Sequence, residues 1–322
     1  MFFKVFHYSE SSEAPHFILN WHTGEVSKSI LCVAHVLNSR SSEWLHSCLL
    51  ISSHLPSIFT STEAFSGTKK LTEHETPPLN SLGDGYSMTI EKERFGNGYE
   101  ITEDDQQKMG DGSTKVSAYL TRQRNRCLRD TKSYFVTEIH KFLNYAFATT
   151  YFAAPDDAAL CADTHTWKTG ETFDNYMTSA FSMTAVDEAL EQGSQIADAV
   201  GEEMQIDYDT IVVRKNTEAH RDAIRLFAEG VTPTAVDDVN IYEGTMKIVA
   251  DPHITYANKN YWFLFDTKIR EENPLYVGIG KYPAFTSPKI QDNESVRQNV
   301  TGYFMQGIIN MPWQILGSPG TT

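Results

Sequence analysis

The 322-residue sequence lacks the short motifs that mark the common classes of enzyme. It has no GxSxG nucleophile elbow, no Walker phosphate-binding loop and no HExxH zinc motif. Its four cysteines, Cys32, Cys48, Cys127 and Cys161, form no CxxC pair. We therefore expect free thiols in a reducing compartment rather than a disulfide or zinc framework. These absences predict a protein that is no enzyme and has no cofactor or metal site.

Positive charge and long apolar runs are scarce as well. The 27 Lys and Arg face 42 Asp and Glu, a formal net charge of −15, which argues against a protein whose main task is binding nucleic acid phosphates. No run approaches the roughly 18 apolar residues of a membrane span. The start, MFFKVFHYSESS, lacks the apolar core of a signal peptide. Hydrophobic residues make up 40% of the chain, which is enough for a real core. Because the sequence shows neither a membrane span nor a signal peptide, we expect a soluble intracellular protein with no membrane partner.

Residues 1–60 differ from the rest of the chain. They hold six of the eleven histidines and sustain neither helical nor strand periodicity. The pattern favours an N-terminal arm whose apolar residues pack on something else. The alternative is a metal site, but the spacing fits no helical or turn-based ligand set. The histidines concerned are His7, His16, His22, His35, His46 and His54.

The segment GDGYSMTIEKERFGNGYEI predicts β structure. Tyr86, Met88 and Ile90 alternate with polar residues, as in a half-exposed strand. Four glycines indicate a hairpin with flexible corners, and none extends to a GxGxxG that opens a helix. These glycines are Gly83, Gly85, Gly96 and Gly98.

A single long helix is expected from about Ser113 to about Thr149. At 1.5 Å per residue it would be about 50 Å long, so part of it must lie along a surface or a neighbouring copy. Its first half is basic, whereas the stretch between Lys168 and Arg214 contains ten acidic residues and no Lys or Arg. These are either solvated faces or, in a self-associating subunit, patches that meet.

The remaining chain alternates helix and strand. We expect an amphipathic helix over Thr184–Met204, with a capping box of Thr184 and Asp187. A second helix starts at Asn216 or Thr217. Strands are expected at Thr210–Val213, Met246–Ala250, Tyr261–Phe265, Leu275–Ile279 and within Val296–Asn310. The pattern is that of an α+β subunit with a compact C-terminal half and an extended N-terminal half.

A few polar clusters invite a chemical interpretation. Asp163 beside His165 could bind a metal or move protons, although a turn stabilised by Asp163 is the favoured interpretation. The acids Glu103–Asp105 are typical of a solvated turn or a helix start. His74 lies in a loop composition, and Trp313 is expected to anchor packing.

The order of these segments resembles the major head subunit of Mu-like phages and prophages. The resemblance covers roughly residues 80–320. It rests on GYSMTIEKERFGNGYEITEDDQQ, the long helix, the insert CADTHTWKTGETFDN, the strand and helix TIVVRKNTEAHRDAIRLF, VNIYEGTMKIVADPHI and YWFLFD. Asp163, Thr164 and His165 match the D-T-x-H-like insert of that family incompletely. Val213-Arg214-Lys215 stands where the family has a V-P-P-like turn.

The resemblance implies a Hong-Kong-97-type capsid fold, which has an N-terminal arm, an extended β-loop, a peripheral domain built on a long spine helix, and an axial domain with a central sheet. On this analogy residues 1–60 form the arm, 61–108 the extended β-loop and 109–161 the spine helix of the peripheral domain. Residues 162–266 form the axial domain, and 267–322 are strands that return to the peripheral domain.

The function implied is that of a major capsid protein that self-assembles into an icosahedral phage head enclosing the genome. Its partners would be copies of itself in pentamers and hexamers, with portal, scaffold or decoration proteins and weak, non-specific contact with DNA. It would be found in the virion, and in the host cytoplasm during assembly. The expected assembly interface comprises Gly83, Gly85, Gly96, Gly98, Arg122, Arg124 and Arg126.

Three other functions compete with this one. One is an encapsulin-like shell of a cellular nanocompartment, which has the same fold and would need a groove for cargo peptides. Another is a soluble enzyme that uses Asp163 and His165, or a metal held by the N-terminal histidines. The third is a smaller ring-forming component of the virion.

Overall fold

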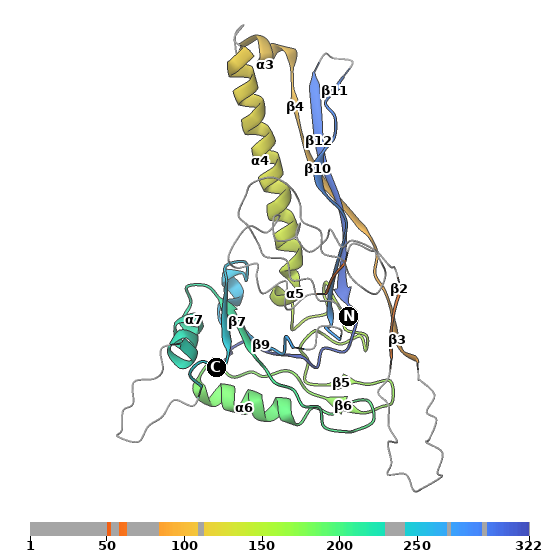
Figure 1. Ribbon diagram of the computed structural model, residues 1–322, viewed down its shortest axis with the longest axis vertical. Coiled ribbons are helices and arrows are strands. Elements are labelled where there is room, and N and C mark those ends of the chain that lie inside the picture. The colour runs from red at the N-terminus through yellow and green to blue at the C-terminus, as the bar shows by residue number, and fades with distance from the viewer. Residues whose placement is uncertain are drawn as a thin grey trace, which may run out of the picture.

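A computed structural model shows a compact body from which a long arm extends (Figure 1). The structure describes residues 50–52, 58–62, 84–108, 113–228, 242–268, 272–291 and 295–321. The predictions for His74, Gly83, Cys32, Cys48 and the six N-terminal histidines fall outside these ranges.

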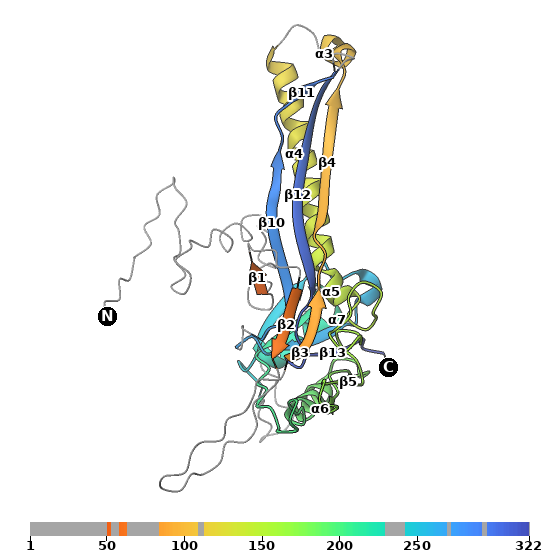
Figure 2. The same ribbon diagram turned by 90° about the vertical axis from the view of Figure 1, so that its right-hand side faces the viewer.

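The arm consists of one antiparallel sheet and one helix. Strand β12 (Val296–Ile308) pairs along one edge with β10 (Leu275–Phe285) and along the other with β4 (Glu93–Ile101). Short strand β11 (Lys289–Ile290) continues the β10 side, and β1 (Leu50–Ser52) adds to β10 in parallel. Helix α4 (Ser113–Ile139) runs along one face of this sheet (Figure 2). A short helix, α3 (Glu103–Lys108), joins β4 to α4 at the tip.

Aromatic side chains fix α4 to the sheet. Phe95 of β4 stacks on Phe135 of α4 with ring centroids 5.8 Å apart, and the ring of Phe304 from β12 meets both edge-on. All three are buried. Edge-to-face and offset aromatic pairs add about 0.5–1.5 kcal/mol each to the burial of their area.

The body is built on a four-stranded mixed sheet of order β13-β9-β7-β8. Strands β7, β9 and β13 are short runs buried on both faces, as in TIVVR and WFLF, whereas the edge strand β8 is only partly buried. They are β7 (Thr210–Arg214), β8 (Lys247–Asp251), β9 (Trp262–Phe265) and β13 (Ile315–Ser318). Two small two-stranded sheets complete the fold, β2 (Ile58–Thr62) with β3 (Asp84–Thr89), and β5 (His165–Thr166) with β6 (Thr172–Phe173).

Helices cover both faces of the body sheet. Ile211 and Val213 point to the side of α6 (Met183–Ser194) and α7 (Glu218–Ala223), whose helix continues as a π-helical turn over Ile224–Ala228. Val212 points to the other side, into a cluster shared with the end of α4 and with α5 (Lys141–Asn144). This shared cluster contains Phe95 of the arm and Phe263 of the body, so the arm and the body have one continuous core.

The predicted hairpin around Gly96 and Gly98 was wrong. β3 pairs with β2 and β4 pairs with β12, so the two successive strands do not pair with each other. Gly96 lies opposite Thr301, where an added Cβ would be 2.5 Å from the carbonyl oxygen of Val300. A close approach of strands, rather than a flexible corner, accounts for this glycine.

Both long helices end earlier than predicted. The single helix expected to Thr149 is divided, since α4 ends at Ile139 and the short helix α5 ends at Asn144. At that end the side chain of Asn144 binds the segment beyond β8, accepting from the Thr255 N–H (2.8 Å) and donating to the His253 carbonyl (3.2 Å). Helix α6 ends at Ser194 rather than Met204. The carboxylate of Asp198 accepts from two N–H groups of the following turn, where Gly201 has φ 82°.

The starts of three helices show which capping prediction held. Ser182, not Thr184, caps α6, since its hydroxyl accepts from the Ala185 N–H (3.1 Å). Thr217 caps α7 as predicted. The acids Glu103–Asp105 form the first turn of α3, which confirms the helix start expected there.

The C-terminal strands do not all return to the arm. β10 and β12 do, but β13 pairs with β9 in the body sheet. Its four residues are buried, and Gly317 is needed because a Cβ there would meet Cys161 Sγ at 2.8 Å and the ring of Phe263 at 2.8 Å. At the other end of the chain, β2 crosses the boundary predicted at residue 60. None of the helices in the described ranges has the length and apolar character needed to cross a membrane.

Candidate assembly interface

An open groove of about 550 Å³ runs between α4 and β4 on the arm. Two of the predicted interface residues, Gly98 and Arg126, line it together. Asn97 closes one side, donating to the Asp130 carboxylate of α4 (2.7 Å). The other lining residues are Tyr99, Gln123, Cys127, Arg129 and Ser133. The groove therefore combines two arginines and one hydrogen-bonded carboxylate with apolar lining atoms.

The other predicted interface residues lie elsewhere. Gly96 lines a smaller hollow beside the groove, and Gly85 lies in β3 at the junction with the body. Arg122 and Arg124 are exposed on α4. Arg124 sits 4.7 Å above the ring of Phe285, on the β10 side of the arm. The six of these residues that the structure describes therefore form no single surface within one copy.

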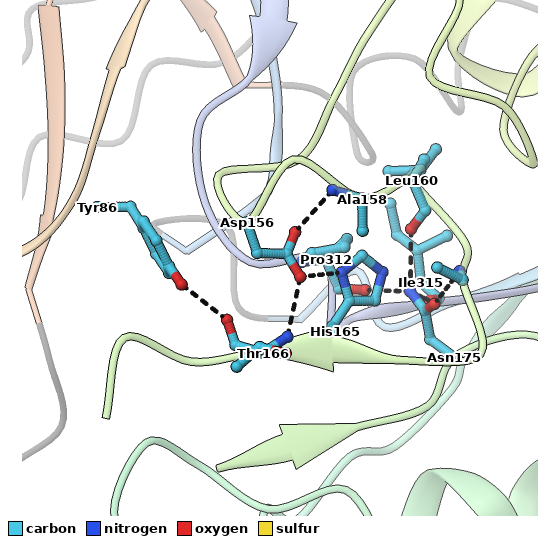
Figure 3. A network of polar contacts seen from close by, with 10 residues as sticks. Tyr86, Asp156, Ala158, Leu160, His165, Thr166, Asn175, Pro312 and Ile315 are labelled. Atoms are coloured by element: carbon cyan, nitrogen blue, oxygen red, sulfur yellow. Dashed lines mark hydrogen bonds and ion pairs between the residues drawn. The ribbon is translucent and has the colours of Figure 1, made fainter. Parts of the chain in front are cut away.

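The polar cluster around His165 is structural. His165 is fully buried, and its Nδ1 lies 2.9 Å from the carboxylate of Asp156, which also accepts from the Thr166 N–H (2.9 Å) (Figure 3). Burial alone would raise the pKa of Asp156, but these hydrogen bonds outweigh it and hold the pKa below its ordinary value. Asp163, which the sequence paired with His165, is exposed instead.

This cluster joins β3 to the body. The hydroxyl of Tyr86 in β3 donates to the Thr166 carbonyl (3.0 Å), one residue from His165 (Figure 3). The ring of His165 stacks on Phe173 with centroids 5.0 Å apart. Phe173 belongs to the same apolar cluster as Trp313, whose predicted role as a packing anchor is confirmed.

Asn175 holds three segments together from a fully buried position. Its Nδ2 lies 2.9–3.0 Å from the carbonyl oxygens of Leu160, Pro312 and Ile315, and its Oδ1 accepts from the Ala162 N–H (2.9 Å) (Figure 3). Nothing in the sequence around Asn175 sets it apart from the other polar residues of the insert. The backbone groups that it satisfies come from positions up to 140 residues away.

A second buried histidine lies where α4 meets the body. The Nδ1 of His140 is 2.6 Å from the Val136 carbonyl oxygen, and its Nε2 is 3.0 Å from Asp251 Oδ2 of β8. Both side chains are buried, and the His253 ring packs 4.6 Å from His140. The pKa of His253 is lowered, mainly by burial and next by the neighbouring His140. Asp251 raises this pKa by a smaller amount.

Neither histidine cluster has the make-up of a metal centre. Across the described ranges, no group of three or more His, Cys, Asp and Glu is placed to hold a metal ion. Cys127 and Cys161 are both buried free thiols, as predicted. Apart from His165 Nε2, which is buried without a hydrogen-bond partner in the described part of the chain, the polar groups at these junctions contact one another or the backbone, and these contacts fix the arm and β3 to the body.

Comparison with known proteins places the fold. No protein-family model and no curated protein matches the sequence. A chain from Mycobacterium phage Patience superposes with a TM-score of 0.52 at 12% identity, over 89% of this chain and 85% of that one. A chain from Microbacterium phage Oxtober96 gives 0.47 at 10% identity, over 98% and 95%. One from the capsid of Myoviridae phage XM1 gives 0.47 at 10% identity, over 97% and 95%.

The likeness to the Patience chain agrees with the architecture described above. A long helix lies on an elongated sheet, and a compact body carries its own central sheet. The chain therefore has the Hong-Kong-97-type fold of phage capsid subunits.

Proposed function

We propose that this chain is the major capsid protein of a tailed phage, and that its copies assemble into the icosahedral head that encloses the genome. The observation that carries the proposal is the fold. It is shared with a phage protein over most of both chains.

The arm itself supports the proposal. It is one sheet thick and has a helix on one face (Figure 2). Along β12, Gly302 and Phe304–Ile308 near the body are buried, whereas Val296–Asn299 toward the tip are only partly covered. The outer edge of β4 has no strand beside it in the described ranges. A partly covered sheet with a free edge gains burial and backbone hydrogen bonds from a neighbouring copy.

In the assembly we propose, copies meet head to tail in pentamers and hexamers, the arrangement that closes into a shell when the rotation permits. The groove between α4 and β4 and the arginines of α4 belong to the contacts of the arm. Portal, scaffold and decoration proteins would be further partners in the virion.

Electron microscopy of the expressed protein, together with sedimentation velocity, tests the proposal. We expect closed shells, or pentameric and hexameric capsomers. A discrete monomer or dimer at every salt concentration would refute the proposal and revive a soluble function. Shells that enclose a host protein, and never DNA, would instead support the nanocompartment alternative.

Arginines of α4 are proposed to contact the packaged DNA without sequence preference. Replacing Arg122, Arg124 and Arg126 with glutamine should leave folding intact, because all three are exposed. The salt dependence of DNA binding by capsomers should fall, by about one unit in the slope of log K against log salt for each lost phosphate contact. The triple change Arg225→Gln, Lys247→Gln and Lys289→Gln removes the same charge elsewhere and serves as the control. An unchanged slope and unchanged genome content in the α4 variant would contradict the proposal.

A further inference from the structure

A cationic patch with an exposed tyrosine lies where β7 meets α7. Tyr256 is 70% exposed, and both the Arg214 guanidinium (5.4 Å) and the Lys259 ammonium (5.3 Å) lie over its ring. Arg214 is held in place, since its Nε donates to the Ile254 carbonyl (3.0 Å). Lys215 and Arg221 flank the same turn, and both lower the pKa of the nearby His220 after the larger effect of its burial.

The patch carries charge that its own copy does not neutralise. Lys215, Arg221 and Lys259 are exposed, and none of them forms an ion pair within the described part of the chain. Arginine and tyrosine held rigidly at a surface are the residue types that most often dominate the binding energy of protein interfaces. The patch therefore has the composition of a contact site for an acidic surface.

The same chain offers such a surface on α6. Glu188 and Glu191 lie one turn apart on its exposed side, opposite the buried face formed by Ala185, Val186 and Ala189. No Lys or Arg lies between Lys168 and Arg214, so α6 and the segments that flank it in the sequence carry no positive side chain of their own. Asp187 is already engaged, because its carboxylate accepts a hydrogen bond from the Tyr242 hydroxyl.

The two surfaces lie on different sides of the body. In Figure 1, α6 runs along the lower side, while α7 stands at the left side. A contact between unlike surfaces of identical subunits is head to tail, and it repeats around a rotation axis until the ring closes. Opposite charges across such a contact select the partner and its orientation.

We propose that the patch formed by Arg214, Lys215, Arg221, Tyr256 and Lys259 binds the acidic side of α6 in the next copy of this chain. The contact deepens the proposed function, on which it rests, by naming the surfaces that join body to body within a capsomer.

Charge reversal and rescue test the contact. Lys215→Glu with Lys259→Glu places like charges against α6, and Glu188→Lys with Glu191→Lys does the same from the other side. Each pair should weaken association at least about tenfold, since like charges facing each other at an interface are strongly unfavourable. The fourfold variant restores opposite charges and should recover assembly. Sedimentation velocity over a range of protein concentrations measures all four proteins, and thermal melting of the unassembled chains confirms that each variant folds.

The control is Lys247→Glu, a charge reversal on the body outside the patch. Strands β7 and β8 run parallel, with Thr210 opposite Lys247 and Arg214 opposite Asp251, so Lys247 lies at the far end of the sheet from the patch. This control should assemble like the wild type. Two results would refute the contact while the proposed function stands. In the first, the wild type and both reversal pairs assemble equally well. In the second, the wild type assembles but the fourfold variant associates no more strongly than either reversal pair.

Two other outcomes separate the alternatives. If the wild type never assembles, the proposed function fails and the contact fails with it. If Lys215→Glu with Lys259→Glu assembles normally but its particles retain less DNA, the patch is a nucleic acid contact, and the inference is overturned in favour of DNA.

Discussion

Replacing Asn175 with alanine is expected to lower the free energy of unfolding by about 4 kcal/mol. The change removes the donor shared by three carbonyl groups and the acceptor of the Ala162 N–H, at a site with no exposed surface. A buried polar group left without a partner costs roughly 1–3 kcal/mol, and several are created at once. Urea unfolding of the unassembled chain, with the midpoint and slope compared to wild type, measures the loss.

Asn97→Ala is the matched control. Asn97 makes an equally short side-chain hydrogen bond, to Asp130 (2.7 Å), but it is exposed, so water replaces the lost partner. Its cost should stay below about 1 kcal/mol. Asn175→Asp provides a second test, because it keeps the acceptor for the Ala162 N–H and turns a carboxylate toward three carbonyl oxygens. It should be no more stable than Asn175→Ala at pH 7. Equal costs for Asn175→Ala and Asn97→Ala would show that Asn175 does not join these segments.

Three of the body strands, β7, β8 and β9, were expected from the sequence because each falls in a short apolar run, whereas β13 (Ile315–Ser318) was not expected. Thr210–Val213 and Tyr261–Phe265 were expected as strands, and β7 and β9 lie there within one residue at the ends. A strand buried on both faces has no polar alternation, so its length and β-branched or aromatic content identify it. The order of such runs along the chain led to the α+β class and to the Hong-Kong-97-type fold.

Pairing over long distances could not be predicted in the same way. The glycine-rich segment Glu93–Ile101 fits a local hairpin as well as it fits the actual partner, β12, about 200 residues further along the chain. The end of the α4–α5 helix depends on contacts of Asn144 with residues more than 100 positions away. Such partners leave no local signal, so both boundaries were misplaced.

The assembly interface stays a prediction. Gly98 and Arg126 line one groove, but Gly85, Gly96, Arg122 and Arg124 lie apart from it. Asp156, the partner of His165, lies nine positions before it, whereas the sequence pointed only to the nearer Asp163, for which a turn was the favoured interpretation. The Pro155-Asp156 start of a turn was the only local sign. The Mu-like subfamily stays a prediction, since a likeness at 12% identity shows the fold alone.

Replacing Asp251 with alanine is expected to cost about 3 kcal/mol of folding free energy. The carboxylate is fully buried, faces His140 Nε2 at 3.0 Å and accepts from the His253 N–H at 2.7 Å. Removing one partner of a buried pair leaves the other without compensation, at a cost of roughly 3–5 kcal/mol. Because this contact ties α4 to β8, hydrogen exchange should also show earlier opening at the junction of the arm and the body than at the tip.

Asp222→Ala removes an ion pair of the same type from the surface. Its partner Arg225 lies at 3.1 Å with a side chain 67% exposed, so the loss should stay below about 1 kcal/mol. Asp251→Asn keeps the acceptor for the His253 N–H and should fall between wild type and Asp251→Ala. Equal stability of Asp251→Ala and Asp222→Ala would contradict a locking role for this junction.

The same junction predicts a dependence of stability on pH. The pKa of His253 is lowered in the folded protein, first by burial and then by His140, so between that pKa and about 6.5 the unfolded chain binds more protons than the folded one. The contribution of neutral His253 to the stability of the folded protein is therefore complete above about pH 6.5. It is lost as the pH falls through the pKa that His253 has in the folded protein. His253→Gln should flatten this part of the profile in urea unfolding between pH 7.5 and 5. His220 also has a lowered pKa, so part of the slope remains, and His220→Gln measures that part. A profile that His253→Gln leaves unchanged would show that protonation of His253 does not weaken the junction.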